Sequence, residues 1–209
     1  MISGNFGRYR ILDRSVPFYN TILRCDRYDT TEFILPDGFS IVPYSDGYEK
    51  EWARLEYAIG DFSDEREAEN YFVSTYLPDR KKRENCLFLL NPKNKVIGSC
   101  IAWQDAHGDS PVSSLHWLVV EEEYQGRGLG KALCLAVMNL FARQSGTPVY
   151  IHTQPWSWKA ILLYISIGFR LQQTDTFSLY ENQYENAMTT LQRVVPEEYF
   201  EIMKKSSDQ

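Results

Sequence analysis

Three glycines at alternate positions form the part of this sequence with the clearest chemical potential. Gly126, Gly128 and Gly130 follow an apolar run and a short acidic turn, and they open a segment with helical periodicity. Because glycine has no side chain to block an anion, consecutive backbone N–H groups can converge on one at the start of a helix. The sequence therefore predicts a phosphate-binding loop directly after a strand.

Two common phosphate motifs do not fit this loop. A Walker loop requires Ser or Thr after its Gly-Lys pair, but Gly130 and Lys131 are followed by Ala132. A dinucleotide fingerprint requires G-x-G-x-x-G with its first glycine at the strand end. Here the spacing is G-x-G-x-G, and residues 121–124 separate the strand from the loop. Another class of phosphate ligand is therefore expected.

Titratable side chains lie on the apolar run before the loop and in the turn that follows it. His116 is the first candidate for a general base, because histidine titrates closest to neutral pH and this one precedes the predicted strand end by four residues. The other interpretation is a structural histidine that is hydrogen-bonded within a sheet. The carboxylates of Glu121, Glu122 and Glu123 are a second candidate, with a solvated turn as the alternative. His152, on the next predicted strand, is a third.

Periodicity and turn residues predict a mixed α/β domain that positions these groups. Helices are expected at Tyr48–Ile59, Glu65–Tyr76, Leu129–Arg143 and Ser157–Ile167, and strands at Phe39–Pro43, Leu87–Leu90, Val96–Trp103, Val112–Val120, Pro148–Thr153 and from Phe169 onward. A strand-like piece lies near residues 18–24, and the basic run at residues 80–83 is expected to be a solvated loop. Residues from about 183 onward are predicted as helical segments interrupted at Pro196.

Composition limits the class of protein. The 209 residues are 44% hydrophobic and 24% charged, which is typical of a globular chain long enough to bury a core. The net charge of −6 argues against a nucleic-acid binder and fits a neutral or cationic small-molecule substrate. Scattered cysteines without a C-x-x-C pair indicate neither a zinc site nor a disulfide framework, so no metal is expected. No apolar run approaches membrane-spanning length, so we expect a cytoplasmic protein without a membrane partner.

Two motifs in this sequence resemble those of the GCN5-related N-acetyltransferase (GNAT) superfamily. The first, Q-x-x-G-x-G, occurs at residues 125–130, and the second, A-x-x-L-Y-x-x-x-G-F, at residues 160–169 with Tyr164 in its centre. Ser157 stands where the family commonly has Asn, three residues before the alanine of the second motif. In addition, residues 115–120 look like the L-H-x-L-x-V segment of arylalkylamine N-acetyltransferases.

The resemblance, which covers about residues 39–179, implies an α/β GNAT fold with a mixed central β-sheet flanked by α-helices and splayed central strands that bind acyl-CoA. It implies acetyl-CoA as the cofactor, with its diphosphate on the loop and its pantetheine along the backbone of the central strand. The amide of Val120 is expected to contact the thioester oxygen. The cofactor-binding residues expected are Leu118, Val119, Val120, Gln125, Gly126, Arg127, Gly128, Leu129, Gly130, Lys131 and Ser157.

Acetyl transfer to an amine requires removal of a proton from the amine and protonation of the departing thiolate. The resemblance implies that His116 performs the first task, because the matching histidine of the arylalkylamine enzymes serves in proton removal. Tyr164 is expected to act as the general acid, since the pKa values of a phenol and a thiol are close. Trp156 and Trp158 lie at the expected acceptor edge, where they could hold an aromatic or cationic group, with ordinary packing as the alternative.

The sequence thus predicts an N-acetyltransferase that transfers the acetyl group of acetyl-CoA to a primary amine, a small molecule rather than a protein, by direct attack in a ternary complex. A non-catalytic acyl-CoA-binding regulatory module and a protein N-acetyltransferase are the alternatives. Three regions are expected: an N-terminal extension packed on the core (1–38), the GNAT domain (39–182) and a helical C-terminal tail (183–209). The extension and the tail could supply the interface of a homodimer.

Overall fold

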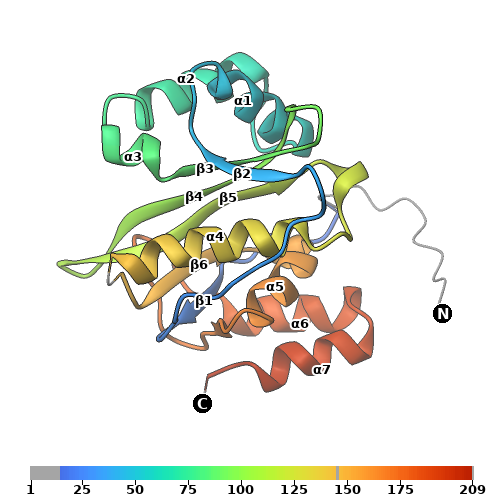
Figure 1. Ribbon diagram of the computed structural model, residues 1–209. Helices are drawn as coiled ribbons and strands as arrows, with labels where there is room; N and C mark the ends of the chain where they lie inside the picture. Colours follow the sequence, from blue (N-terminus) through green and yellow to red (C-terminus); the bar gives the residue numbers. More distant parts are fainter. Residues whose placement is uncertain (1–14, 145, 209) are drawn as a thin grey trace.

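A mixed β-sheet with helices on both faces forms the body of the protein (Figure 1). The computed structural model describes residues 15–144 and 146–208, so the first part of the expected extension and the last residue of the tail lie outside the described residues. The strands are β1 (Thr21–Cys25), β2 (Ser40–Pro43), β3 (Cys86–Leu90), β4 (Val96–His107), β5 (Ser110–Val120), β6 (Val149–Thr153) and β7 (Arg170–Leu171). The helices are α1 (Tyr48–Ile59), α2 (Glu65–Thr75), α3 (Arg80–Glu84), α4 (Leu129–Arg143), α5 (Trp158–Ile165), α6 (Tyr184–Val194) and α7 (Glu197–Lys205), with 3-10 turns η1 (Glu122–Tyr124) and η2 (Pro155–Ser157).

The strands of this sheet follow the order β2-β3-β4-β5-β6-β1-β7. Neighbouring strands pair antiparallel except β5 and β6, which are parallel. A parallel pair needs a crossover connection, and α4 provides it by crossing one face of the sheet between the two strands. The predicted fold class, a mixed sheet flanked by helices, is confirmed.

Each face of the sheet carries its own apolar layer. On the face covered by α4, Leu133 and Val137 are fully buried. Helices α1 and α2 cover the other face (Figure 1). The layer on that face is aromatic, with Trp52, Phe72 and Phe88 fully buried. Full burial of one such side chain contributes about 1.5–3 kcal/mol. The two layers therefore hold the β4–β5 pair firmly from both sides.

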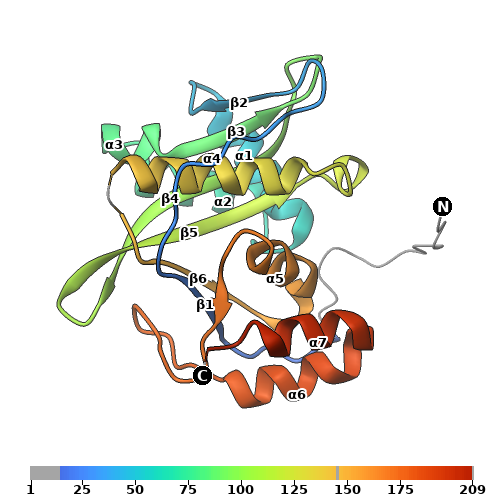
Figure 2. The same cartoon turned by 60° about the horizontal axis from the view of Figure 1, so that its bottom comes forward.

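The strand nearest the amino terminus, β1, lies inside the sheet between β6 and β7 (Figure 2). It pairs antiparallel with β6 along its whole length, from Thr21 opposite Thr153 to Cys25 opposite Val149. Its other edge pairs with β7 at Leu23, which is fully buried. The strand-like pattern near residues 18–24 indicated a strand but gave no information about where it pairs.

The chain crosses α4 on its way from β1 to β2, as Figure 2 shows. Asn139 of α4 fixes this crossing, because its Oδ1 accepts the N–H of Thr31 and its Nδ2 donates to the Thr31 carbonyl, both at 2.9 Å. The phenol of Tyr28 donates to the same Oδ1 at 3.2 Å. Residues 15–38 thus contribute both a strand and a strap to the main body, while the division of the chain at residues 38 and 182 stays a prediction.

The expectation of a solvated loop at residues 80–83 is wrong, because these residues belong to the short helix α3. Asp79 caps it by accepting the N–H of Lys82 at 2.9 Å, and Arg80 forms an ion pair with Glu84 at 2.7 Å. A capping carboxylate and an i,i+4 charge pair both stabilise a helix, and long unbranched charged side chains lose little freedom in one. The charge pattern taken as a sign of solvation also suits an exposed helix.

The carboxy-terminal helices α6 and α7 pack beside α5 (Figure 2). The break between them falls at Pro196, as predicted, because proline cannot donate a backbone hydrogen bond within α6 but is tolerated just before α7. The ring of Trp158 in α5 lies 5.8 Å from that of Tyr199 in α7, between centroids. Over residues 15–144 and 146–208, no helix combines the length and apolarity that a membrane span requires.

Candidate active site

Strands β5 and β6 separate in the middle of the sheet, which leaves a gap beside β5 (Figure 2). The two strands pair only where Ser113 faces Val149 and Ser114 faces Tyr150. Beyond this point β5 continues to Val120 with no described strand on that side, while β6 pairs with β1. Backbone groups on this edge of β5 can therefore bond an extended ligand as they would bond another strand.

A β-bulge kinks β5 beside the gap. Trp117 and Leu118 of β5 lie together opposite the single residue Cys100 of β4. The φ angle of Trp117 is 52°, in the left-handed region that is costly for a bulky side chain. The bulge lets the consecutive residues His116 and Trp117 lie on the same face of the sheet. Trp117 packs on the aromatic layer under α1 and α2. Trp103, whose ring lies beside that of His116, packs on the same layer.

The amide of Val120 faces the gap. Glu121 donates its N–H to the carbonyl of Ile97 at 2.8 Å, and Val120 lies opposite Gly98. The alternation of an antiparallel ladder therefore turns the Val120 N–H away from β4. The Val120 carbonyl accepts a hydrogen bond from Nε2 of Gln125 at 2.9 Å, which ties the glycine loop to the end of the strand.

The glycine loop has the backbone geometry of an anion site. Gly126 and Gly128 have φ angles of 74° and 78°, and a Cβ at either position would meet nothing within 4 Å. Backbone conformation, not crowding, therefore requires glycine at both positions. The N–H groups of residues 126–131 have no acceptor in the described part of the chain, and Ala132 is the first to donate, to the Gly128 carbonyl. Consecutive free amides at the start of α4 suit a diphosphate.

Side chains of the loop divide between solvent and core. Arg127 and Lys131 are exposed and can add positive charge near a bound anion. Leu129 is buried in the apolar core, so its backbone amide alone can reach a ligand. A Cβ on Gly130 would lie 3.4 Å from Cδ1 of Leu163 in α5. This glycine therefore allows α4 and α5 to approach each other closely.

His116 lies two residues beyond the last β5–β6 pair, on the face that α1 and α2 cover. Its Nε2 is 3.9 Å from Oδ2 of Asp105, and its ring centroid is 5.9 Å from that of Trp103. Burial lowers the pKa of His116 to about 4, against an opposing influence of the Asp105 carboxylate. The imidazole is therefore uncharged at neutral pH, as a proton acceptor must be.

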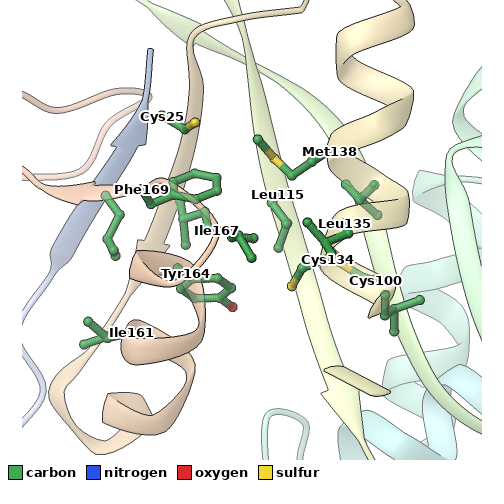
Figure 3. Packing of buried hydrophobic residues seen from close by; sticks show 14 of the residues in the cluster. Cys25, Cys100, Leu115, Cys134, Leu135, Met138, Ile161, Tyr164, Ile167 and Phe169 are labelled. Atoms are coloured by element: carbon green, nitrogen blue, oxygen red, sulfur yellow. The ribbon is translucent and has the colours of Figure 1, made fainter. Parts of the chain in front are cut away.

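Tyr164 lies on α5 on the other side of the sheet. Figure 3 shows its hydroxyl directed away from α5, toward Leu115 of β5 and Cys134 of α4. Burial raises the pKa of Tyr164 well above its ordinary value, and the thiols of Cys134 and Cys100 act in the same direction. Successive strand residues face opposite sides, so His116 and Tyr164, which packs with Leu115, lie on opposite faces of the sheet beside one gap.

The three glutamates after β5 do not act alike. Glu121 is held in ion pairs with Arg54 at 2.5 Å and Lys95 at 2.8 Å. Burial alone would raise the pKa of Glu121, but the hydrogen bonds from Lys95 and Arg54 outweigh it and lower that pKa. Glu122 and Glu123 are exposed in the turn η1. Glu121 therefore links α1, β4 and the loop. None of the three glutamates lies on β5 beside the gap, as His116 does.

His152 stands on β6 across the gap from His116. Its Nε2 is 2.8 Å from Oδ1 of Asn20, and its ring stacks on that of Tyr180 with centroids 3.8 Å apart. Burial lowers the pKa of His152 to about 4, and the neighbouring His116 acts in the same direction. Both histidines are thus neutral at neutral pH, and His152 is the one fixed by a hydrogen bond and a stacked ring.

The segment after β6 is packed rather than open. The Oγ of Ser157 accepts a hydrogen bond from Nε2 of Gln154 at 2.8 Å, at the junction between η2 and α5. The ring of Trp156 lies 5.4 Å from that of Phe18, and Trp158 contacts the tail helix α7. These contacts favour the packing interpretation of both tryptophans. The cofactor contact expected of Ser157 stays a prediction.

Sequence reasoning missed the residues that join His116 from distant parts of the chain. Asp105 lies near the end of β4, Tyr180 follows β7, and Asn20 precedes β1. Each stands alone in a stretch without a motif, and only the pairing of β4 with β5 and of β1 with β6 brings them to the same region. An isolated polar residue at the end of β4 was the only sequence signal, and it is too common to interpret.

A central strand left unpaired on one edge, followed at once by free amides at a helix start, suits an extended ligand that carries a phosphate group. The model described as the Acetyltransferase (GNAT) family matches residues 46–169, which is more than half of the chain. The chain belongs to this family, whose members use acetyl-CoA. The family resemblance predicted from the two motifs is thereby confirmed.

Among curated proteins, the chain is similar to two bacterial enzymes named mycothiol acetyltransferase. That of Nocardiopsis dassonvillei is 32% identical over 96 residues, which is 42% of this chain and 28% of the relative. That of Kocuria rhizophila is 28% identical over 169 residues, 69% of this chain and 50% of the relative. The chain thus spans half or less of the length of these relatives. A solved GCN5-related N-acetyltransferase from Sphaerobacter thermophilus shares the fold, with a TM-score of 0.56, 17% identity, and coverage of 74% of this chain and 48% of that one.

Proposed function

We propose that this protein is an acetyl-CoA-dependent N-acetyltransferase that acts on a small-molecule primary amine. The observation that carries the proposal is the position of the unpaired edge of β5 directly before the free amides of residues 126–131. Together they offer a continuous backbone surface for a long ligand with a diphosphate in its middle. Membership of the acetyltransferase family supports the same reading.

The residues present fit the cofactor. The amides of residues 126–131 would hold the diphosphate, with charge added by Arg127 and Lys131. Backbone groups of Leu118 would bond the pantetheine along β5, and the N–H of Val120, which is turned away from β4, would bond the thioester oxygen. The backbone of Val119, which lies opposite Ser99, is turned toward β4, so the contact expected of this residue does not belong to the proposal. Acetyl-CoA supplies an acetyl group activated as a thioester.

His116 acts as the base in this proposal. An alkylammonium has a pKa near that of lysine, about 10.4, and must lose a proton before its nitrogen can attack. The imidazole of His116 is uncharged at neutral pH, because burial lowers its pKa to about 4, so the lone pair of Nε2 is free to accept that proton. The same shift in pKa weakens Nε2 as a base, so the transfer is uphill and is drawn forward by loss of the proton to solvent. The proton then passes from Nε2 to solvent.

Tyr164 acts as the acid from the opposite face of the sheet. The amine nitrogen bonds to the acetyl carbon while the carbon–sulfur bond breaks, and the Tyr164 hydroxyl gives its proton to the departing thiolate. The nitrogen loses its second proton to solvent as the amide forms, and Tyr164 regains one from solvent. One proton is released overall, and no covalent enzyme intermediate is needed.

A small-molecule acceptor is supported by the comparisons and by charge. The two curated relatives are named for mycothiol and not for a protein acceptor. The net charge of −6 favours an acceptor that is cationic or neutral.

Two measurements test the proposal. Calorimetry should detect binding of acetyl-CoA, and a CoA-release assay with polyamines, arylalkylamines, amino acids and peptides should identify an acceptor. Tyr164→Phe should then lower kcat by about 10²-fold or more, the usual contribution of a general acid, with the Kd for acetyl-CoA unchanged.

Tyr44→Phe is the matched control, because its hydroxyl bonds Glu49 beside β2 at the far edge of the sheet. It should leave both kcat and the Kd unchanged. Absence of acetyl-CoA binding would contradict the whole proposal. Binding without turnover of any acceptor would favour the non-catalytic acyl-CoA module, and turnover of peptides alone would favour a protein acetyltransferase.

A further inference from the structure

A carboxylate without a cationic partner stands beside the candidate base. Ile101 and Asp105 of β4 share a face of the strand, and Ile101 lies opposite His116 of β5. The Oδ2 of Asp105 is 3.9 Å from Nε2 of His116, beyond the 2.7–3.2 Å of an N–H···O hydrogen bond. Both side chains are only partly exposed, at 15% and 20%. The two groups therefore lie close together without a direct hydrogen bond, so each atom can still bond a third group placed beside both.

Backbone hydrogen bonds fix the position of this carboxylate. Its Oδ1 accepts the N–H of Ala106 at 2.9 Å, which fixes the orientation of Asp105. Ser178 donates its N–H to the Ala106 carbonyl at 2.6 Å, and this bond holds the segment after β7 against the end of β4. Tyr180, two residues beyond Ser178, is thereby held near the end of β4. Burial raises the pKa of Tyr180, and the charges of Asp105 and Tyr71 add to the effect. Figure 2 shows this segment beside the β4–β5 hairpin.

The charge of the cluster is negative. The titratable groups that face His116 are Asp105 on its own sheet and His152 across the gap. Tyr180 lies near the carboxylate, and Tyr71 lies near Tyr180. Both histidines are neutral at neutral pH, because burial lowers their pKa values. Among residues 15–144 and 146–208, no lysine or arginine nitrogen lies within 4.0 Å of Asp105. A partly buried carboxylate in this setting lacks its counter-charge.

We propose that Asp105 binds the protonated nitrogen of the acceptor and that the acceptor is accordingly a cationic alkylamine, an inference that rests on the N-acetyltransferase function proposed above. An alkylammonium has several N–H donors, so one can bond Oδ2 of Asp105 while another points to Nε2 of His116. A separation of 3.9 Å between these atoms is one that a single nitrogen can bridge.

This arrangement separates binding from deprotonation. The N–H bond directed at His116 breaks, its proton moves to Nε2, and the electron pair stays on the nitrogen for the attack on the acetyl carbon. The N–H bond to Asp105 meanwhile holds the nitrogen in place. Asp105 takes no proton in this step, and no group is oxidised or reduced.

Kinetics with Asp105→Asn test the proposal. Phenylethylamine, which is charged at about pH 7, and aniline, which is not, serve as probe acceptors. The variant should raise KM for phenylethylamine about tenfold or more, the usual effect of losing a charged hydrogen-bond partner, while KM for acetyl-CoA and kcat/KM for aniline stay unchanged. Asp105→Glu should restore part of the preference for the charged amine.

Asp109→Asn is the matched control, because Asp109 is exposed in the turn of the same hairpin. It should change neither KM. An unchanged preference for phenylethylamine over aniline in Asp105→Asn would overturn the proposal, since a merely structural role would alter both acceptors alike.

A binding measurement separates this inference from the proposed function. Calorimetric titration of the protein, saturated with CoA, with phenylethylamine requires no turnover. Asp105→Asn should weaken this binding about tenfold relative to the unsubstituted protein and to Asp109→Asn. Equal affinity in the three proteins would overturn the role of Asp105. Absence of CoA release with every amine, together with the expected loss of affinity, would instead refute catalysis and leave the cation site standing.

Discussion

The two sides of the gap beside β5 are built in different ways. On the cofactor side, the groups suited to a diphosphate are the consecutive amides of residues 126–131, and their direction is set by two glycines with positive φ. On the acceptor side, the groups around His116 come from separate segments of the chain, namely Asn20, Asp105, His152 and Tyr180. One side is a local structure, and the other is a tertiary one.

This difference determines how strongly the function of each side depends on the identity of its side chains. A backbone site needs only glycines and a helix start, so it can serve the same cofactor whatever the surrounding side chains are. The acceptor side depends on side chains whose identities can change one at a time without disturbing the loop. We therefore expect substitutions on the two sides to separate cleanly in their effects on the two substrates.

The largest separation is expected from His116→Gln. Loss of the base should lower kcat by about 10²–10⁴-fold, the range usual for general base catalysis, while the Kd for acetyl-CoA stays unchanged. Steady-state kinetics and calorimetry measure the two effects. His107→Gln, at the tip of the same hairpin, should have neither effect. A kcat close to that of the unsubstituted enzyme would move the role of base to another group.

The opposite result is expected from Gly128→Ala on the cofactor side. An alanine in the left-handed region costs about 1–2 kcal/mol, and relief of this strain would redirect the free amides. The Kd for acetyl-CoA should therefore rise by about 5- to 30-fold, with the acceptor KM little changed.

Gly108→Ala is a close control for that variant. Gly108 has a φ angle of 58° and equally open surroundings, but it lies in the β4–β5 turn. It should lose similar stability without losing acetyl-CoA affinity. Equal affinities in the two variants would show that the loop conformation does not control cofactor binding.

A stability measurement probes the layer that supports the acceptor side. Glu56 of α1 is fully buried, and its carboxyl oxygens have no hydrogen-bond partner among the described residues. Burial raises the pKa of Glu56 well above its ordinary value, and the charge of Asp61 adds to the effect. A carboxyl whose pKa is higher in the folded state stabilises the fold at low pH, and this stability is lost as pH rises from about 4.5 toward the folded-state pKa.

Glu56→Gln should therefore stabilise the protein more at about pH 8 than at about pH 5. The difference in unfolding free energy between variant and unsubstituted protein should grow by up to about 1.4 kcal/mol per pH unit in the range where the folded-state group stays protonated. Denaturant titrations at the two pH values measure it. Glu65→Gln, on the exposed start of α2, should show no such trend. A difference independent of pH would mean that Glu56 is ionised in the folded protein.

The smallest effect is expected from Asn20→Ala, which removes the hydrogen-bond partner of His152. A neutral hydrogen bond contributes about 0.5–1.5 kcal/mol, so KM for the amine should rise by about 2- to 10-fold while KM for acetyl-CoA stays constant. Asn139→Ala also releases a contact of the amino-terminal segment, but on the α4 face. It should leave the amine KM unchanged. Equal effects of the two variants would indicate general loosening of this segment instead of a role at the acceptor side.

Much of the fold follows from local patterns in the sequence. The bounds predicted for α1 and α4 match those observed, because apolar residues recur along each helix at its period and glycines flank both. The strands β3 to β6 occur where strands were predicted between turn residues, but β4 and β5 extend further into their shared hairpin, to His107 and from Ser110. The helix α3 was missed, since charge pairing inside a short exposed helix resembles a solvated loop.

The sequence by itself determined the glycine loop before α4 and the family, because glycine at a given spacing acts through its own backbone and requires no distant partner. Tertiary structure alone decided the insertion of β1 between β6 and β7, the burial that lowers the pKa of His116, and the approach of Asp105 and Tyr180. Strand pairing and desolvation join residues that are far apart along the chain, and no local pattern encodes which strand will lie beside which.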